Sequence, residues 1–224
     1  MSLLETIKIH PDRLSENISF LDEFFASKEM TWTFVIKGFE RVSTDVFECL
    51  ENVPCTSVAS AIPEVLLSYR NHHPRAETWW LNYDGAPCPY DWVDVNLTHA
   101  PSTNRDCLMI ELDELREGCI QERVIQLVNQ GTCRHVGAYL DCTSLPAERF
   151  LLRWKSLGLN ADITRSLGTS VSFSMVDQMR AVGVNHYRIG ELAITGRDLL
   201  TQDPIPGMRQ DSVTPVESHT FLFQ

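Results

Sequence analysis

The chain has 224 residues, of which 43% are hydrophobic, and it carries a formal net charge of −11. This length favours one large domain, and the acidic balance argues against a nucleic-acid backbone or an anionic membrane as partner. No apolar stretch is long enough to span a bilayer, the N-terminus lacks the pattern of a signal peptide, and the seven cysteines form no Cys-x-x-Cys pair. We therefore expect a cytoplasmic protein with reduced thiols.

The first predicted element is a helix at residues 11–27. Apolar side chains recur there at helical spacing, and Pro11 stands in the first turn, where a proline costs no hydrogen bond. Eight short apolar runs follow, each bounded by turn residues or polar residues. We predict strands at residues 31–36, 55–59, 77–81, 93–97, 107–112, 135–140, 162–165 and 186–189.

Helical patterns separate most of these runs, at residues 44–51, 62–69, 119–129, 147–157 and 172–182. Strands that alternate with helices pair in parallel through right-handed crossovers. Eight such units predict an α/β fold, a (β/α)8 barrel of the TIM type, whose functional groups gather at the carboxyl ends of the strands. The fourth and fifth runs lie too close together for a helical crossover, so we expect no full helix between them.

The two ends of the chain fall outside this count. We assign residues 1–202 to the barrel and residues 203–224 to a C-terminal tail, whose prolines predict a loop. Residues 7–9 and 220–223 are both short, apolar and typical of strands. Because exposed strand edges need partners, we predict that these two segments pair, within one chain or between two chains.

Lys37 carries the functional prediction. It ends the first apolar strand, where burial lowers the pKa of an amine and prepares it to form an imine with an aldehyde. At the last strand, Arg188 and Gly190 end another short run, where backbone N–H groups can receive a phosphate. The two features together indicate pyridoxal 5'-phosphate (PLP) across the mouth of the barrel, although a lone lysine at a strand end is usually a surface residue. The histidines lack metal-ligand spacing, and no Gly-x-Ser-x-Gly elbow is present, so we predict neither a metal site nor a serine triad.

Five segments, met in order along nearly the whole chain, resemble the fold-type III PLP enzymes. This family includes alanine racemase, and the likeness is closest to its ornithine racemase-like branch. The segments are residues 9–17 for the entry strand and first helix, 35–37 for the Schiff-base strand, 110–118 for the fifth strand, 166–170 for the phosphate loop and 188–207 for the last strand and its exit. The resemblance implies the barrel of the alanine racemase N-terminal domain.

The resemblance also implies roles for the matching residues. Lys37 would hold PLP as a Schiff base and act as a base at the α-carbon of an amino-acid substrate. Ser166 and Ser170, with the backbone around Gly190 and Glu191, would bind the phosphate. Ser170 can also cap the helix that follows it.

Two arginines complete the implied cofactor seat. Arg188 would face the pyridine nitrogen, and because a guanidinium stays protonated, that nitrogen would stay neutral. A neutral ring is a weak electron sink, which favours brief carbanion chemistry such as racemisation. Arg116 would donate to the phenolic oxygen of PLP or to a substrate carboxylate; its other interpretation is a solvated charge beside neighbouring glutamates.

Some positions depart from the family pattern. The loop after Lys37 matches neither branch, and at the sixth strand Leu140 or Asp141 must replace the histidine or asparagine that faces the cofactor; we include Asp141 among the catalytic candidates. The chain also ends where the family's C-terminal β-domain begins, and that domain supplies a tyrosine as second base, usually from a partner subunit. Candidate replacements in this chain are Tyr139, Tyr83, His99 and Asp141; a homodimer or a partner subunit could also supply the base.

Three functions remain open from the sequence. The first is a PLP-dependent enzyme that acts at the α-carbon of an amino acid, as a racemase, an epimerase or a related lyase. The second is a PLP carrier, because the PLP homeostasis proteins are also single barrels. The third is a degenerate barrel that serves as an interaction subunit, which the missing helix suggests. The retention of Lys37, Ser170 and Arg188 favours the first two.

Overall fold

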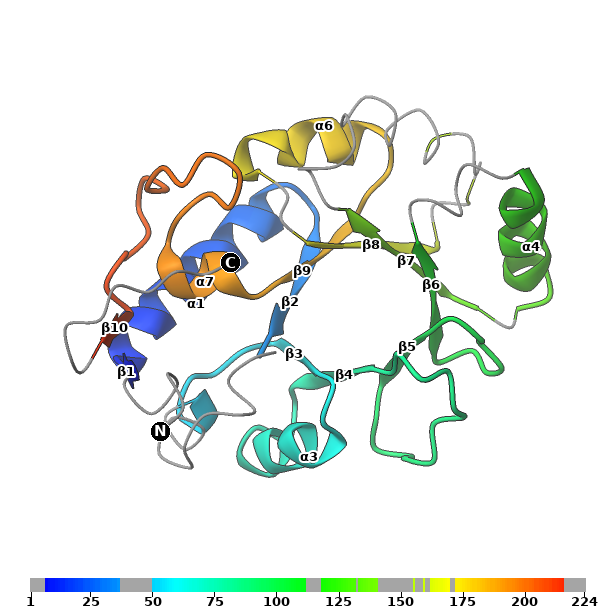
Figure 1. The fold of residues 1–224 in the computed structure, drawn as a ribbon, viewed down its shortest axis with the longest axis horizontal. Helices are drawn as coiled ribbons and strands as arrows, with labels where there is room; N and C mark the ends of the chain where they lie inside the picture. The colour runs from blue at the N-terminus through cyan, green and yellow to red at the C-terminus, as the bar shows by residue number, and fades with distance from the viewer. Residues whose placement is uncertain are drawn as a thin grey trace.

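Eight parallel strands close into a barrel in chain order, as predicted (Figure 1). The computed structural model describes residues 7–36, 50–111, 118–131, 133–140, 155, 159, 162–169 and 172–215. The barrel strands are β2 (Thr31–Val35), β3 (Ser57–Ser60), β4 (Glu77–Leu81), β5 (Val95–Thr98), β6 (Asp106–Glu111), β7 (His135–Leu140), β8 (Thr164–Thr169) and β9 (His186–Ile189). The last strand, β9, pairs with the first, β2, so the sheet has no free edge.

Helices cover the outside of the barrel (Figure 1). They are α1 (Pro11–Ser27), α3 (Pro63–His72), α4 (Gly118–Asn129), the 3-10 turn η4 (Phe173–Met175), α6 (Val176–Ala181) and α7 (Glu191–Thr195). The predicted helix at residues 11–27 is confirmed, and its apolar face is buried against the barrel. Among the described residues, no helix is long and apolar enough to cross a bilayer.

Alternation along the strands divides side chains between the interior of the barrel and the helical layer. On β9, the imidazole of His186 and the guanidinium of Arg188 reach side chains of other strands inside the barrel. Tyr187, between them, packs its ring on Phe25 of α1 at a centroid distance of 5.3 Å. The interior therefore contains polar side chains, whereas the main apolar core lies between the strands and the helices.

The wall at β5 is covered by loops in place of helices. No helix forms in residues 82–94 or 99–105, which confirms the predicted lack of a helix between β5 and β6. Hydrogen bonds to a buried carboxylate hold this connection in the absence of a helix. Asp106 accepts from the backbone N–H groups of Ser102 (2.6 Å) and Thr103 (2.7 Å) and from Asn96 Nδ2 (2.7 Å). These bonds satisfy the buried carboxylate and fix the short connection.

The N-terminal strand does pair with the tail, but with a different part of it than predicted. Strand β1 (Ile7–Ile9) pairs antiparallel with β10 (Val213–Pro215), and Lys8 stands opposite Thr214. His10 adds a side-chain bond to Thr214, with 3.0 Å between Nε2 and Oγ1. Residues 220–223, the predicted partner, lie outside the described residues.

Some predicted bounds need correction. Strand β8 was expected at residues 162–165 but runs from Thr164 to Thr169, because the chain pairs with β7 along this whole length. The helix expected at residues 172–182 is divided into η4 and α6. The helices expected at residues 44–51 and 147–157 lie almost wholly outside the described residues.

Candidate functional site

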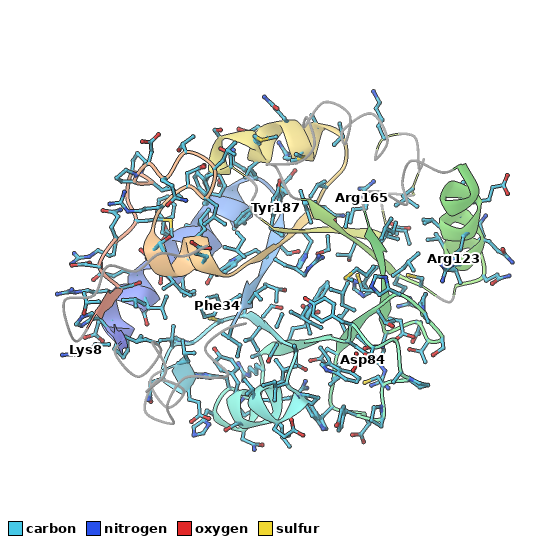
Figure 2. All side chains as sticks on the ribbon, viewed as in Figure 1. Lys8, Phe34, Asp84, Arg123, Arg165 and Tyr187 are labelled. Carbon is cyan, nitrogen blue, oxygen red and sulfur yellow. The ribbon has the colours of Figure 1, made fainter. Side chains whose placement is uncertain are left out.

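Arg188 lies inside the barrel, near the carboxyl ends of the strands. Its side chain comes from β9, and the residue is only 5% exposed. The guanidinium donates from Nη1 to Ser166 Oγ on β8, at 2.6 Å, and from Nη2 to the carbonyl of Ala138 on β7, at 3.0 Å. Contacts to two further strands thus hold the cation in one position. Figure 2 draws the described side chains on the ribbon of the barrel.

Two glycines make room for this arginine. A Cβ on Gly137 would lie 2.9 Å from Arg188 Nη1, and a Cβ on Gly168 would overlap the guanidinium, at 2.8 Å from its central carbon. Both distances are shorter than a carbon contact allows. The glycines on β7 and β8 therefore leave the space that the buried guanidinium fills.

A chain of hydrogen bonds leads from Arg188 to the opposite end of the barrel. Ser166 Oγ contacts His186 Nδ1 at 2.7 Å, and His186 Nε2 contacts Thr33 Oγ1 at 2.9 Å. Thr33 continues to Ser57 Oγ at 2.7 Å. The five residues from Arg188 to Ser57 thus form one continuous path across β9, β8, β2 and β3.

The chain ends at Glu77, the first residue of β4. Ser57 Oγ donates to Glu77 Oε2 at 3.1 Å, and Trp79 Nε1 donates to the same oxygen at 2.7 Å. A carboxylate only accepts and a guanidinium only donates. Ser57 therefore gives its one hydrogen to Glu77, Thr33 gives its hydrogen to Ser57, and the N–H at His186 Nε2 donates to Thr33.

These bonds place a hydrogen on Nε2 of His186, and in the neutral ring Nδ1 then accepts from Ser166. Burial, together with the charge of Arg188 and the neighbouring His135, lowers the pKa of His186 well below its ordinary value of 6.5. Trp79 covers the ring, with 4.5 Å between ring centroids and 6° between planes.

The ends of β2 and β9 meet at the carboxyl-terminal mouth. A Cβ on Gly190 would lie 2.9 Å from the carbonyl oxygen of Val35, so glycine is needed for this close approach. The next residue, Ile36, is buried and donates its N–H to the carbonyl of Ala59 at 2.9 Å. Lys37 follows Ile36 in the sequence but lies outside the described residues.

The structure describes only some of the predicted site residues. Arg188 and Ser166 lie in contact, Gly190 follows β9, and Glu191 begins α7 with its side chain exposed. Ser166 lies within β8, so residues 166–169 form a strand where a loop was expected, and their role at a phosphate stays a prediction. The other predicted site residues, Lys37, Arg116, Asp141 and Ser170, lie outside the described residues.

The candidates for a second base are only partly placed. Tyr83 and His99 follow β4 and β5, so both lie at the carboxyl-terminal mouth, with Tyr83 45% exposed. The side chain of Tyr139 and the whole of Asp141 lie outside the described part of the structure. The identity of a second base therefore stays a prediction.

Sequence reasoning missed His186, Thr33, Ser57, Glu77 and Trp79. A weak signal was present, because each of the strands β3, β4 and β9 begins with a polar residue. Only the register of the barrel shows that these side chains meet.

No protein-family model matches the sequence, and no curated protein matches it. Solved structures do match. Alanine racemase from Bartonella henselae with covalently bound pyridoxal phosphate aligns with a TM-score of 0.63 at 13% identity, over 91% of this chain and 64% of that chain. Alanine racemase from Corynebacterium glutamicum gives a TM-score of 0.63 at 14% identity, over 93% and 67%. The enzyme from Clostridium difficile 630 in complex with cycloserine gives 0.58 at 12% identity, over 96% and 62%.

This chain has the fold of the alanine racemase barrel. At the level of the fold, this similarity confirms the resemblance that the sequence motifs indicated. The chain spans 64% of the length of the Bartonella racemase. The described residues also fit a PLP seat: a buried cation lies on the last strand, two glycines form its cradle, and Gly190 brings the end of β9 to the end of β2. In this alanine racemase-like barrel, the strand that leads to Lys37 ends at the same mouth.

Proposed function

We propose that the protein binds PLP at the carboxyl-terminal mouth of its barrel and acts at the α-carbon of an amino acid, with racemase-like chemistry. The observation that carries this proposal is the buried guanidinium of Arg188, which Ser166 and the carbonyl of Ala138 hold beside two glycines. The resemblance assigns an arginine at this place to the pyridine nitrogen of PLP. A cytoplasmic protein with a small-molecule substrate is consistent with this assignment.

When bound, PLP would supply an electron sink for the α-carbon of an attached amino acid. Arg188 would keep the ring nitrogen unprotonated, since its guanidinium donates hydrogen bonds and does not release its proton. Ser166 and Ala138 would keep Arg188 from moving when a ligand arrives. Lys37, directly after Ile36, would supply the amine that holds the cofactor and would move the proton at the α-carbon.

The assignment of Lys37 is tested by absorbance and mass spectrometry. Protein loaded with PLP should show a visible absorption band, and borohydride should reduce the adduct and fix its mass on the peptide that contains Lys37. The Lys37→Ala chain should lose both signals, whereas Lys155→Ala, which removes an exposed lysine, should keep them. An adduct that persists in Lys37→Ala would contradict the assignment.

The chemistry is tested with individual amino acids in deuterated water. Deuterium should enter the α-position, because Lys37 can remove and return a proton on one face; inversion also needs a donor on the other face. That donor would come from Tyr139, Tyr83, His99 or Asp141, or from a second copy of the chain or a partner subunit. Loaded protein that gives no exchange, inversion or product with any amino acid would indicate a carrier of PLP instead.

A further inference from the structure

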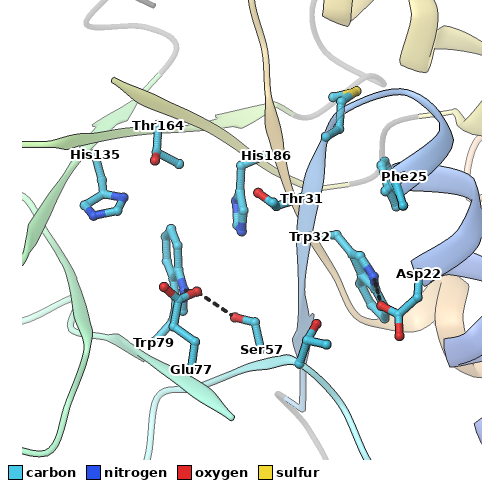
Figure 3. A pocket seen from close by; sticks show the side chains of 13 residues that line it. Asp22, Phe25, Thr31, Trp32, Ser57, Glu77, Trp79, His135, Thr164 and His186 are labelled. Carbon is cyan, nitrogen blue, oxygen red and sulfur yellow. Dashed lines mark hydrogen bonds between the residues drawn. The ribbon is translucent and has the colours of Figure 1, made fainter. Parts of the chain in front are cut away.

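A cavity of about 570 Å³ lies at the other mouth of the barrel, where the strands begin (Figure 3). Its size suits a small organic molecule. Six of its lining residues are each the first residue of a barrel strand, and all six are polar: Thr31, Ser57, Glu77, His135, Thr164 and His186. The cavity therefore opens at the end of the barrel opposite the mouth at which we place PLP.

Negative charge predominates in this cavity. Glu77 and Asp22 line it, and its thirteen lining residues, all within the described part of the chain, include neither lysine nor arginine. Among the described residues, Ser57 and Trp79 donate hydrogen bonds to Glu77, both to Oε2, which leaves Oε1 for a ligand. Asp22 accepts from Trp32 Nε1 at 2.7 Å. A cationic group is the natural complement of these carboxylates.

The two histidines do not cancel this charge. His186 is neutral because burial, the charge of Arg188 and the neighbouring His135 lower its pKa well below its ordinary value. Burial also lowers the pKa of His135; the charge of Arg134 acts in the same direction and that of Glu77 acts against both. The Nδ1 atom of His135 is buried and has no hydrogen-bond partner among the described residues. An unpartnered acceptor is less costly than an unpartnered donor, so the proton belongs on Nε2.

The remaining wall of the cavity is apolar. Phe25, Ala26, Met30, Trp32 and Trp79 provide it, on α1, β2, β4 and the turn between α1 and β2. A carboxylate at one side and hydrocarbon at the other match an ion that has a charged head and an apolar chain.

We propose that this cavity is a second ligand site, for a primary alkylammonium ion. Its ammonium group donates to the carboxylate of Glu77, and its chain lies against the apolar wall that includes Met30 and Trp32. This site goes beyond the proposed function, because it needs neither PLP nor Lys37. The ion binds through one charge-assisted hydrogen bond and the burial of its alkyl chain.

The test is a titration of the full chain with n-butylammonium chloride, with the histidine side chains followed by ¹⁵N NMR. Saturable shifts of the His135 and His186 signals are expected, and n-butanol, which has the same chain without the charge, should not produce them. The Lys37→Ala chain should respond as the natural chain does, which separates this site from imine formation at the proposed cofactor lysine. The absence of saturable shifts, or an equal response to n-butanol, would overturn the proposal.

Two substitutions locate the ion. Glu77→Gln keeps an acceptor for Ser57 and Trp79 but removes the charge, and it should weaken binding about tenfold or more. Glu122→Gln, on the exposed face of α4, should leave the affinity unchanged. Thr31→Arg, at an exposed position on the cavity wall, brings a fixed cation to the carboxylates and should abolish binding, with folding checked by the melting temperature. Unchanged affinity in folded Glu77→Gln or Thr31→Arg would contradict the site.

Discussion

Arg188 and Glu77 stand at the two ends of one hydrogen-bonded chain that crosses the interior of the barrel. Ser166, His186, Thr33 and Ser57 lie between them, and no step of the chain exceeds 3.1 Å. Glu77 only accepts, so the bonds from His186 Nε2 through Thr33 and Ser57 all point towards it. Because the lowered pKa of His186 keeps its ring neutral, Nδ1 accepts from Ser166. The chain thus determines that the hydroxyl hydrogen of Ser166, which accepts from Arg188, points to His186.

The first prediction concerns the tautomer of His186. Long-range ¹H–¹⁵N spectra of the histidine side chains should show His186 as the neutral Nε2–H form at pH 7. In Glu77→Met the acceptor at the end of the chain is lost, so Ser57 can turn its hydroxyl towards Thr33, and the Nδ1–H form should become populated. An Nδ1–H form in the natural chain would contradict the direction assigned to the bonds.

The second prediction is that the free energy of unfolding falls as the medium is acidified. Burial lowers the pKa of both His135 and His186 below 6.5, their ordinary value. The unfolded chain therefore takes up protons below pH 6.5 that the folded chain does not bind, and stability present above that pH is lost as the pH falls. Each group contributes up to about 1.4 kcal/mol per pH unit in this window.

Urea denaturation at several pH values measures this effect. His135→Gln should flatten the profile between pH 6.5 and 5, because it removes one of the two groups. The same variant compared with the natural chain at pH 8 gives the matched control, since neither histidine is charged there in either state. A profile equally steep in both proteins would show that His135 does not contribute.

Much of the fold could be predicted from the sequence, because the residue pattern of each strand and helix favours the same element that the barrel requires at that place. The strands Glu77–Leu81, His135–Leu140 and His186–Ile189 were predicted with the bounds observed, since each run contains β-branched and aromatic residues and ends before a polar or turn residue. The helix Pro11–Ser27 has both an apolar face and a proline in its first turn. The alternation of these elements then leaves few topologies other than the barrel.

The polar interior could not be predicted in this way. Thr33, Ser57 and Glu77 come from three strands, and nothing in the sequence near His186 shows that they are its neighbours. Ser166 and Gly168 were read as a loop, since small residues and glycine are typical of turns. In the barrel they are small because Arg188 fills the space beside them. Lys37, Arg116, Asp141 and Ser170 lie outside the described residues, so their roles remain predictions.

The third prediction concerns the space around Arg188. Gly168→Ala should lower the free energy of unfolding by about 1–3 kcal/mol, because the new methyl group overlaps the guanidinium and forces a shift in a packed interior. Arg188→Ala removes the obstacle, so Gly168→Ala should cost less in that background. A double-mutant cycle in urea measures the difference, and additive effects would show that the two residues do not compete for space.

The last prediction concerns Asn17, a fully buried polar residue on the apolar face of α1. Its Nδ2 donates to the carbonyls of Ala193 and Arg209, both at 2.9 Å, and its Oδ1 accepts from the N–H of Arg209 at 2.6 Å. One side chain thus joins the first helix to α7 and to the segment that leads to β10. Asn17→Ala leaves these buried backbone groups without partners.

We expect Asn17→Ala to lower the free energy of unfolding by about 2–4 kcal/mol, since each unsatisfied buried group costs about 1–3 kcal/mol and some rehydrate. Ser19→Ala, at an exposed position of the same helix, provides the control and should change stability by less than about 0.5 kcal/mol. Chemical denaturation followed by tryptophan fluorescence measures both values. If Asn17→Ala lowered the free energy of unfolding as little as Ser19→Ala, the three bonds would not stabilise the contact of α1 with α7 and with the segment that leads to β10.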